Sequence, residues 1–285
     1  MAYEKKTDNC EEFEGCNGIC EGCPNAEKEG KTDFGIHTND YSDIKKIYTV
    51  MSGKGGVGKS MVTSLIASAL SKKGLNVAIL DADITGPSIP KTLGIKDKAK
   101  GSEYGIIPCL SKTGIRVMSI NLLLQDDTDP VVWRGPVIAS SISQFYEETV
   151  WGDIDVMLID MPPGTGDVPL TVFQSIPVDG IITVTSPQDL VSLIVEKAIK
   201  MANLMNIPLL GVIENMSYFK CPDCGKEHKI YGDSHLDDVL KEYNIDLWSK
   251  LPISQEFSSH QDNGSIEDID VPELDNFVNK IIESL

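Results

Sequence analysis

A glycine-rich segment between a β-branched run and an expected helix constrains this chain most strongly. Residues 49–60 read TVMSGKGGVGKS, and four of them match the spacing GxxxxGK[ST]. In such a loop, backbone N–H groups surround phosphates, the lysine reaches the outer phosphates and the hydroxyl binds Mg²⁺. The helix that follows points its positive dipole end at the same place. A plain glycine-rich turn is the alternative, but strand, loop and helix follow in the order that a nucleoside triphosphate site requires. The predicted nucleotide-binding residues of the loop are Gly53, Lys54, Gly55, Gly56, Val57, Gly58, Lys59 and Ser60, with Ser60 also a ligand of Mg²⁺.

Apolar runs alternate with helical patterns after the first forty or so residues. The expected strands are 46–52, 76–82, 115–120, 155–160, 180–186 and 209–215, and the expected helices are 60–73, 137–149, 189–206 and 274–285. Continuous hydrophobicity within the strands indicates burial on both faces. This pattern predicts an α/β fold, a mostly parallel P-loop sheet with helices on both faces, whose ligand lies at the carboxyl ends of the strands. Residues 1–43 are polar and cysteine-rich, so we expect an extended appendage there and a P-loop domain over 44–285.

Two acidic motifs follow expected strands. The first, DADITGPS, starts at Asp81, and the second, DMPPGTGD, starts at Asp160. A carboxylate after a buried strand is well placed to bind Mg²⁺, so Asp160 is predicted to be catalytic and a magnesium ligand. Asp83 is predicted to orient the attacking water, and Gly164 to offer its N–H to the γ-phosphate. Helix-capping or turn roles for these aspartates are the alternative.

Charge and hydropathy limit the partners. With 25 basic and 43 acidic residues the net charge is -18, which repels phosphate backbones and anionic lipid, so we expect no nucleic acid and no membrane as partners. No apolar run approaches the roughly eighteen residues that span a bilayer, and no signal-peptide pattern opens the chain. We therefore expect a cytoplasmic protein, in which the seven cysteines are ligands or redox groups rather than disulfides.

The loop GKGGVGKS resembles the deviant Walker A of the SIMIBI class of P-loop ATPases, which includes MinD, ParA and nitrogenase iron protein. That resemblance implies that Lys54 reaches across a homodimer to the partner's nucleotide and acts there as a catalytic charge. The further motifs WRGP (133–136), TSPQ (185–188), ENMSYF (214–219) and CPDCG (221–225), with the two acidic motifs, resemble the Mrp/ApbC group of iron–sulfur cluster carrier ATPases from about residue 45 to about residue 265. The resemblance implies slow ATP hydrolysis, transfer of a [4Fe–4S] cluster to apo iron–sulfur proteins, and adenine recognition by Asn215. The stretch PISQEF after Leu251 departs from the family pattern, so no adenine contact is expected there.

Two cysteines follow the last expected strand. Cys221 and Cys224 supply two thiolates, whereas a tetrahedral metal site or a cluster typically needs four protein ligands. Two copies facing across a twofold axis supply four, and the family resemblance places a bridging [4Fe–4S] cluster there. A zinc knuckle completed by His228 or by the partner chain is the alternative. A redox pair is disfavoured because no helical pattern starts at Cys221.

The remaining cysteines are four near the amino terminus and Cys109. The amino-terminal set is compact and ends in Cys-Pro, a pattern reminiscent of ferredoxin cluster loops, although its gaps differ from the usual run. We expect an iron–sulfur cluster there, with zinc or free thiols as alternatives. Cys109, in an apolar run, is expected to be a buried hydrophobic residue. The amino-terminal ligands would be Cys10, Cys16, Cys20 and Cys23.

These expectations combine into a homodimeric, ATP-dependent iron–sulfur cluster carrier with ATP, Mg²⁺ and a [4Fe–4S] cluster as its ligands. The first rival hypothesis is a MinD- or ParA-like regulatory ATPase with a structural zinc site. The acidic last helix, within PELDNFVNKIIESL, argues against the membrane-binding form of that rival, because a membrane-surface helix would be basic on its polar face. An electron-transfer ATPase like nitrogenase iron protein, whose cluster cycles and stays bound, is the second.

Overall fold

The computed structural model describes residues 36–83, 88–124, 135–187 and 191–285. The four amino-terminal cysteines and the first half of the WRGP motif lie outside these ranges, so the predictions made for them stay predictions. The first strand begins at Ser42, slightly before the domain boundary expected at residue 44.

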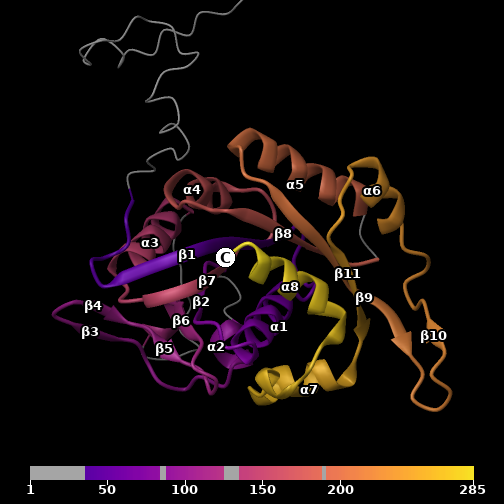
Figure 1. Ribbon diagram of the computed structural model, residues 1–285, viewed down its shortest axis with the longest axis horizontal. Coiled ribbons are helices and arrows are strands. Elements are labelled where there is room, and N and C mark those ends of the chain that lie inside the picture. Colours follow the sequence, from indigo (N-terminus) through magenta and orange to yellow (C-terminus); the bar gives the residue numbers. More distant parts are fainter. Residues whose placement is uncertain (1–35, 84–87, 125–134, 188–190) are drawn as a thin grey trace, which may run out of the picture. The chain divides into compact units, whose positions relative to one another are not determined.

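One large sheet organises the described chain (Figure 1). Its strands β1, β2 and β6–β9 run parallel, β11 lies parallel beside β9, and β5 and β10 pair antiparallel at their ends of the order. A separate hairpin joins β3 (Lys100–Ser102) to β4 (Gly105–Ile107). The predicted mostly parallel P-loop sheet is therefore confirmed. In spatial order the strands are β10 (Glu227–His228), β9 (Leu209–Lys220), β8 (Gly180–Thr185), β1 (Ser42–Ser52), β7 (Gly152–Asp160), β2 (Val77–Asp81), β6 (Arg116–Ser119) and β5 (Cys109–Leu110), with β11 (Trp248–Ile253) on β9.

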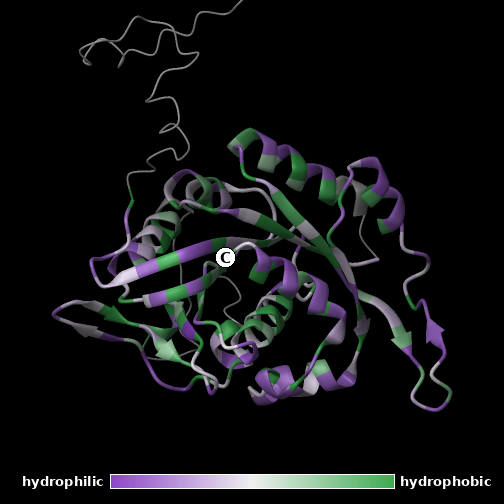
Figure 2. Ribbon diagram, viewed as in Figure 1, coloured by the Kyte–Doolittle hydropathy of each residue, from purple (hydrophilic) through white to green (hydrophobic). Residues whose placement is uncertain are grey.

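Helices cover both faces of the sheet and enclose a core on each. One core joins the sheet to α1 (Lys59–Lys72), α2 (Ile89–Thr92), α7 (Gln255–Asn263) and α8 (Asp275–Glu283). The other joins it to α3 (Gly135–Glu148), α4 (Asp167–Ser175) and α5 (Val191–Met205). A smaller cluster packs α6 (Leu236–Glu242) and α5 against β9. Hydrophobic and hydrophilic colouring alternate along the helices (Figure 2), as they do in amphipathic covering layers.

The expected helices and strands are present, with ends that shift by a few residues. The largest difference is β9, which continues to Lys220 instead of ending near residue 215, because the polar residues after Ile213 interrupt the apolar run without ending the strand. Trp151 lies in the core: its side chain is fully buried and its indole N–H donates to the carbonyl of Tyr146 at 3.1 Å. Cys109 is buried as expected, and that burial raises the pKa of its thiol.

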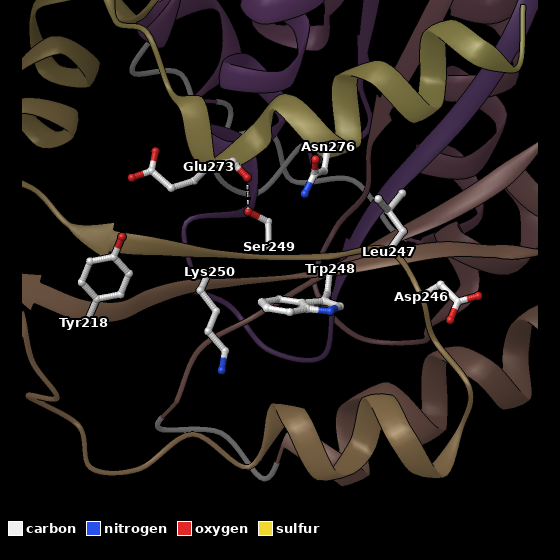
Figure 3. Close-up of a pocket in the computed structure, with 8 residues that line it drawn as sticks. All are labelled: Tyr218, Asp246, Leu247, Trp248, Ser249, Lys250, Glu273 and Asn276. Atoms are coloured by element: carbon white, nitrogen blue, oxygen red, sulfur yellow. Dashed lines mark hydrogen bonds between the residues drawn. The ribbon is translucent and has the colours of Figure 1, made fainter.

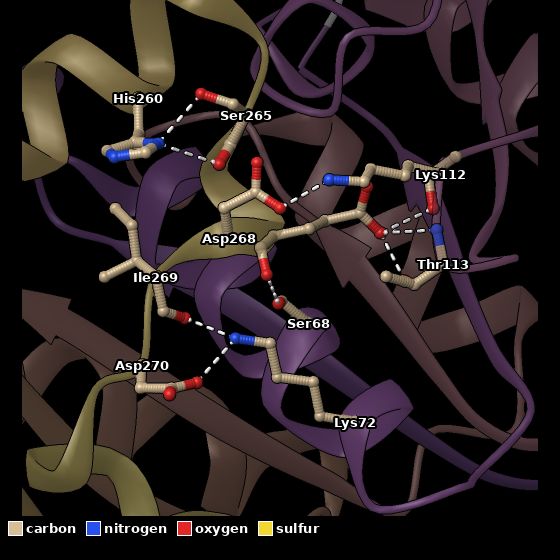
Figure 4. Close-up of polar contacts among 11 residues, drawn as sticks. Ser68, Lys72, Lys112, Thr113, His260, Ser265, Asp268, Ile269 and Asp270 are labelled. Carbon is tan, nitrogen blue, oxygen red and sulfur yellow. Dashed lines mark hydrogen bonds and ion pairs between the residues drawn. The ribbon is translucent and has the colours of Figure 1, made fainter.

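Polar contacts fix the segment after α7 against α1 and the turn before β6 (Figure 4). Lys72 donates to the carbonyl of Ile269 at 2.7 Å and pairs with Asp270. The carboxylate of Glu267, only 4% exposed, accepts a 2.7 Å hydrogen bond from the Ser111 hydroxyl. It also accepts bonds from the backbone N–H and the hydroxyl of Thr113. This cluster holds the carboxyl-terminal part of the chain on the face that α1 covers. Among the described residues, no helix is long and apolar enough to cross a bilayer.

Candidate nucleotide site and cysteine hairpin

The predicted phosphate loop joins the end of β1 to the start of α1. Two of its glycines adopt left-handed backbone, Gly56 at φ 81° and Gly58 at φ 79°, a conformation that L side chains disfavour. A Cβ on Gly58 would lie 2.3 Å from Nδ2 of Asn215, and one on Gly53 would lie 2.6 Å from Cγ1 of Ile194. The loop therefore needs glycine at Gly58 for two reasons, its backbone conformation and the close approach of Asn215.

Three of the four predicted catalytic residues, Lys59, Asp83 and Asp160, meet where β1, β7 and β2 end. Val50 and Asp81 both lie opposite Asp160 in the register, so the strand ends coincide. Nζ of Lys59 lies 2.8 Å from Oδ2 of Asp160 and 3.6 Å from Oδ2 of Asp83. The structure thus brings together side chains from three separate motifs, as the sequence predicts.

Hydroxyl groups complete this cluster. The Ser60 hydroxyl donates to Oδ2 of Asp160 at 2.5 Å, and the Thr63 hydroxyl lies 2.8 Å from Oδ1 of the same carboxylate. Asp160 is fully buried, and both of its carboxylate oxygens have hydrogen-bond partners, as buried polar groups usually do. Thr63 was not predicted; its position one helical turn after Lys59, on the same face of α1, is the signal that could have found it.

Asp81 is a further unpredicted member of the site. It is buried, and its carboxylate accepts bonds from the backbone N–H of Asp83 at 3.1 Å and from the Ser119 hydroxyl at 3.0 Å. Burial, with the neighbouring negative charge of Asp160, raises the pKa of Asp81 well above its usual value. The shift therefore favours the protonated form of Asp81 more strongly than in a solvent-exposed aspartate.

These groups fit the chemistry of a magnesium-bound nucleotide. The Ser60 hydroxyl and the Asp160 carboxylate are oxygen donors on one side of Lys59, and Mg²⁺ prefers such hard oxygen ligands. Lys59 and the loop N–H groups would contact phosphates, for which positive charge and helix N-termini are suited.

Two further residues, Gly164 and Lys54, are predicted to contact nucleotide. The backbone N–H of Gly164 donates to the carbonyl of Ser52 at 2.8 Å, so a γ-phosphate would have to replace that bond. A small cavity of about 50 Å³ lies beside it, and the Thr183 hydroxyl on its wall has no hydrogen-bond partner among the described residues. Lys54 is exposed at the loop surface. The roles of Gly164 and Lys54 therefore stay predictions.

Asn215 lies beside the phosphate loop, in the interior of β9. Its Nδ2 donates to the carbonyl of Val57 at 2.9 Å, and its Oδ1 has no partner among the described residues although the side chain is 1% exposed. A buried amide oxygen without a donor suits a ligand with an N–H group, such as the amino group of adenine. Recognition of adenine by Asn215 stays a prediction that this geometry supports.

Cys221 and Cys224 lie on a hairpin that extends β9 beyond the sheet edge. Residues 218–233, here called the cysteine hairpin, contain the end of β9, the CPDCG turn and β10. The turn is closed by bonds from the Cys221 N–H to the Lys226 carbonyl and from the Gly225 N–H to the Cys221 carbonyl. Hydrogen bonds from the backbone of Cys224 and Asp223 lower the pKa of the Cys221 thiol, which favours the thiolate that binds metal.

The described residues around this pair supply no complete metal site. No group of three or more potential ligands among His, Cys, Asp and Glu comes together in the described ranges, so His228 does not complete a zinc site with the two thiols. No helix begins at Cys221, which agrees with the expectation against a thioredoxin-like pair. A metal or cluster bound by this pair would need further ligands from outside the described part of this chain.

A groove of about 470 Å³ runs along β11, away from the predicted site residues (Figure 3). Trp248 and Lys250 extend to one side of the strand, and Ser249 points to the other side, where it bonds to the Glu273 carbonyl. Lys250 also lies 5.6 Å from the centre of the Trp248 ring and pairs with Asp237 of α6. None of the predicted binding or catalytic residues lines this groove.

Comparison with known proteins agrees with the site. The family model described as ParA, NUBPL iron-transfer P-loop NTPase, matches residues 43–285. The chain is 39% identical over 268 residues to the iron–sulfur cluster carrier protein of Clostridium perfringens, covering 88% of this chain and 94% of that protein. It is 44% identical over 258 residues to the iron–sulfur cluster carrier protein of Methanocaldococcus jannaschii, covering 87% and 89%.

Solved structures give the same result. A nucleotide-binding protein from Archaeoglobus fulgidus in complex with ADP is 41% identical, with a TM-score of 0.74 over 81% of this chain and 91% of that chain. The MinC:MinD complex of Aquifex aeolicus, at 18% identity and a TM-score of 0.58, shows the shared fold alone. With its P-loop, its acidic strand ends and its cysteine pair, this chain belongs to the family of iron-transfer P-loop NTPases that includes the iron–sulfur cluster carrier proteins.

Proposed function

We propose that this chain is an ATP-hydrolysing carrier that binds a [4Fe–4S] cluster between two copies of itself and transfers it to apo iron–sulfur proteins. In this proposal the four thiolates are Cys221 and Cys224 of each subunit, and the cluster is cargo. The observation that carries it is that one strand, β9, passes the phosphate loop at Asn215 and ends in the cysteine hairpin. The pair has favourable thiolate chemistry but too few ligands to hold a cluster alone.

Hydrolysis is assigned to the cluster around Lys59. With Mg²⁺ bound at Ser60 and Asp160, the metal would neutralise charge that develops on the phosphates. Asp83, 3.6 Å from Lys59, would accept a hydrogen bond from an attacking water. Lys54 of the partner would add positive charge in trans, as an arginine finger does in other NTPases. Turnover is slow in this proposal because the site is complete only in the dimer.

Nucleotide binding must also rearrange the site. Nζ of Lys59 contacts Asp160 at 2.8 Å, and the Gly164 N–H donates to the Ser52 carbonyl. Phosphate and Mg²⁺ would replace both contacts and so move the segments that follow Asp81 and Asp160. We propose that this change alters dimer geometry and thereby the retention of the bridging cluster.

The test is anaerobic reconstitution of the full chain with ferrous iron and sulfide. Wild type should contain iron and sulfide, show visible absorbance, and activate an apo-acceptor such as aconitase at a rate that differs between ATP and ADP. The variant with Cys221→Ala and Cys224→Ala should lose transfer but keep whatever iron the amino-terminal cysteines bind. Lys59→Ala should lose the difference between ATP and ADP while it still binds iron.

Two results would contradict the proposal. Zinc without iron or sulfide after anaerobic preparation would instead favour a regulatory ATPase with a structural zinc site. A cluster that is reduced and reoxidised but never leaves for the acceptor would favour electron transfer. A sedimentation experiment should show a dimer that depends on the Cys221 and Cys224 pair when the cluster is bound.

A further inference from the structure

A buried carboxylate ties both ends of the cysteine hairpin to the strand residue next to Asn215. Glu214 is fully buried in β9. Its Oε1 accepts a 2.6 Å hydrogen bond from the Ser217 hydroxyl, immediately before the hairpin, and its Oε2 accepts one of 2.6 Å from the Ser234 hydroxyl, immediately after it. Ser234 also accepts from the backbone N–H of Leu236, at the start of α6. One side chain therefore fixes where the hairpin leaves the sheet and where it returns.

The backbone between Glu214 and the hairpin is irregular. Glu214 lies opposite Lys250 and Tyr218 lies opposite Pro252, so β9 has three residues between these pairs where β11 has one. Met216, at the centre of this bulge, has φ 58°, a left-handed conformation that costs a residue with a side chain about 1–2 kcal/mol. Such strain persists only where surrounding contacts enforce it. The bond from Ser217 to Glu214 spans the bulge and is placed to enforce it.

Asn215 lies within the same bulge. Asn215 directly follows Glu214 and precedes Met216, and its side chain contacts the phosphate loop through the carbonyl of Val57. A change of nucleotide state that moves Asn215 would therefore act on the bulge, and the bulge is bound through Glu214 to both ends of the hairpin.

We propose that Glu214 is a positioning residue that couples nucleotide state at Asn215 to the orientation of Cys221 and Cys224, an inference that rests on the proposed function for its role in cluster transfer. Burying a carboxylate is costly unless its oxygens are bonded. The bonds to Glu214 come from serines at the two ends of the hairpin, and no cation among the described residues forms a salt bridge with it. A side chain needed only for packing would serve as well without a charge.

The test measures the cysteines directly, without a cluster. The full-length protein is prepared without iron or zinc. The alkylation rate of Cys221 by iodoacetamide is then measured by peptide mass spectrometry, once with Mg-ADP and once with a magnesium-bound non-hydrolysable ATP analogue. Wild type should show rates that differ by about fivefold or more between the two nucleotides, the lower end of typical coupling. In Glu214→Ala the ratio should fall to near one while both nucleotides still bind.

Two variants separate coupling from stability. Glu214→Gln keeps one acceptor and gains a donor that the serine hydroxyls can accept, so it should retain most of the ratio. Glu267→Ala removes another buried carboxylate that hydroxyls bind, but one on the face covered by α1 and away from Asn215 and the hairpin. It should lower stability and leave the nucleotide ratio of Cys221 unchanged. If Glu214→Ala does not fold, Ser217→Ala removes one of the two bonds and should reduce the ratio.

The inference is overturned if Glu214→Ala, or Ser217→Ala in its place, keeps the wild-type ratio, or if wild type itself shows equal rates with both nucleotides. These outcomes are distinct from failure of the proposed function. Absence of cluster transfer in wild type would remove the carrier assignment, yet a nucleotide ratio that depends on Glu214 would still establish the coupling.

Discussion

Lys59 should stabilise the nucleotide-free protein as well as bind phosphate. Its Nζ lies 2.8 Å from a carboxylate that is fully buried, and the lysine itself is 6% exposed. Replacing Lys59 with Met keeps the length of the side chain but leaves Asp160 with two hydroxyl donors and no cation. Because removal of one partner strands the other charge in the interior, Lys59→Met should cost about 3–5 kcal/mol of unfolding free energy.

The reverse substitution should be milder. In Asp160→Asn, Lys59 keeps Asp83 at 3.6 Å, and the repulsion between Asp160 and Asp81 disappears. We expect a loss of less than about 2 kcal/mol, a hydrogen-bond scale effect. The double variant, with Lys59→Met and Asp160→Asn, no longer has a buried Asp160 carboxylate without a cation. Its loss of unfolding free energy should therefore be smaller than the sum of the two single losses by about 2 kcal/mol.

Urea unfolding of metal- and nucleotide-free protein, followed by circular dichroism, measures all four species. Equal slopes would show that the denatured states are comparable. The reasoning is refuted if Lys59→Met lies within about 1 kcal/mol of wild type, or if the two losses add. The result also decides how a Lys59 variant without ATPase activity is interpreted. Loss of ATP hydrolysis indicates loss of a phosphate contact only at temperatures where the variant is folded.

Two further predictions concern the loop and the pH dependence of stability. Gly58→Ala should destabilise the protein by about 1–3 kcal/mol more than Gly56→Ala in the same urea assay. Both glycines have positive φ, but only a Cβ at Gly58 would meet Asn215. Equal losses of unfolding free energy in the two variants would contradict this. The hydrogen bond from Lys45, with one from the Asn76 backbone, lowers the pKa of Asp155 in the folded state, so its contribution is present above the unfolded value of about 3.9 and disappears as pH falls through the folded pKa. Asp155→Asn should therefore lower the melting temperature at pH 6, and this deficit should shrink as pH falls below about 3.9, so a deficit that is constant with pH would refute the assignment.

The meeting of the candidate catalytic groups was predictable because parallel strands end at one edge of a sheet. Lys59, Asp83 and Asp160 each follow an apolar run, and that rule alone places them together. The contribution of Asp81 was not predictable, because an aspartate after a strand does not reveal whether its carboxylate faces solvent or another carboxylate. Burial depends on the register of β2 against β7, which only the folded sheet defines.

The elements at the carboxyl-terminal side of the sheet were harder to predict. Strand β11 contains Pro252 and charged Lys250, which fit an edge position and weaken the strand pattern. Helix α7 buries only Phe257 of its nine residues, so it has almost no hydrophobic periodicity, and its start is marked only by the Ser254 side chain that accepts from the Glu256 N–H. Helix α7 is held by tertiary contacts with α2 and with the turn Ile266–Asp268 that follows α7. Such contacts leave no signal in the local sequence.

The length of β9 decides what kind of coupling is possible between nucleotide and cysteines. From Asn215 to Cys221 an extended chain covers at most about 20 Å, at about 3.3 Å per residue, and a bulge shortens it. The cysteine hairpin at the end of that run is largely exposed, so solvent would screen direct electrostatic control from a phosphate at Lys59. Nucleotide control of the cysteines, as proposed here, would instead pass through an element with two arrangements. The bulge at Met216 is a strained segment of β9 between the two sites, which is why its side-chain tie, Glu214, is the residue on which nucleotide control of the cysteines should depend.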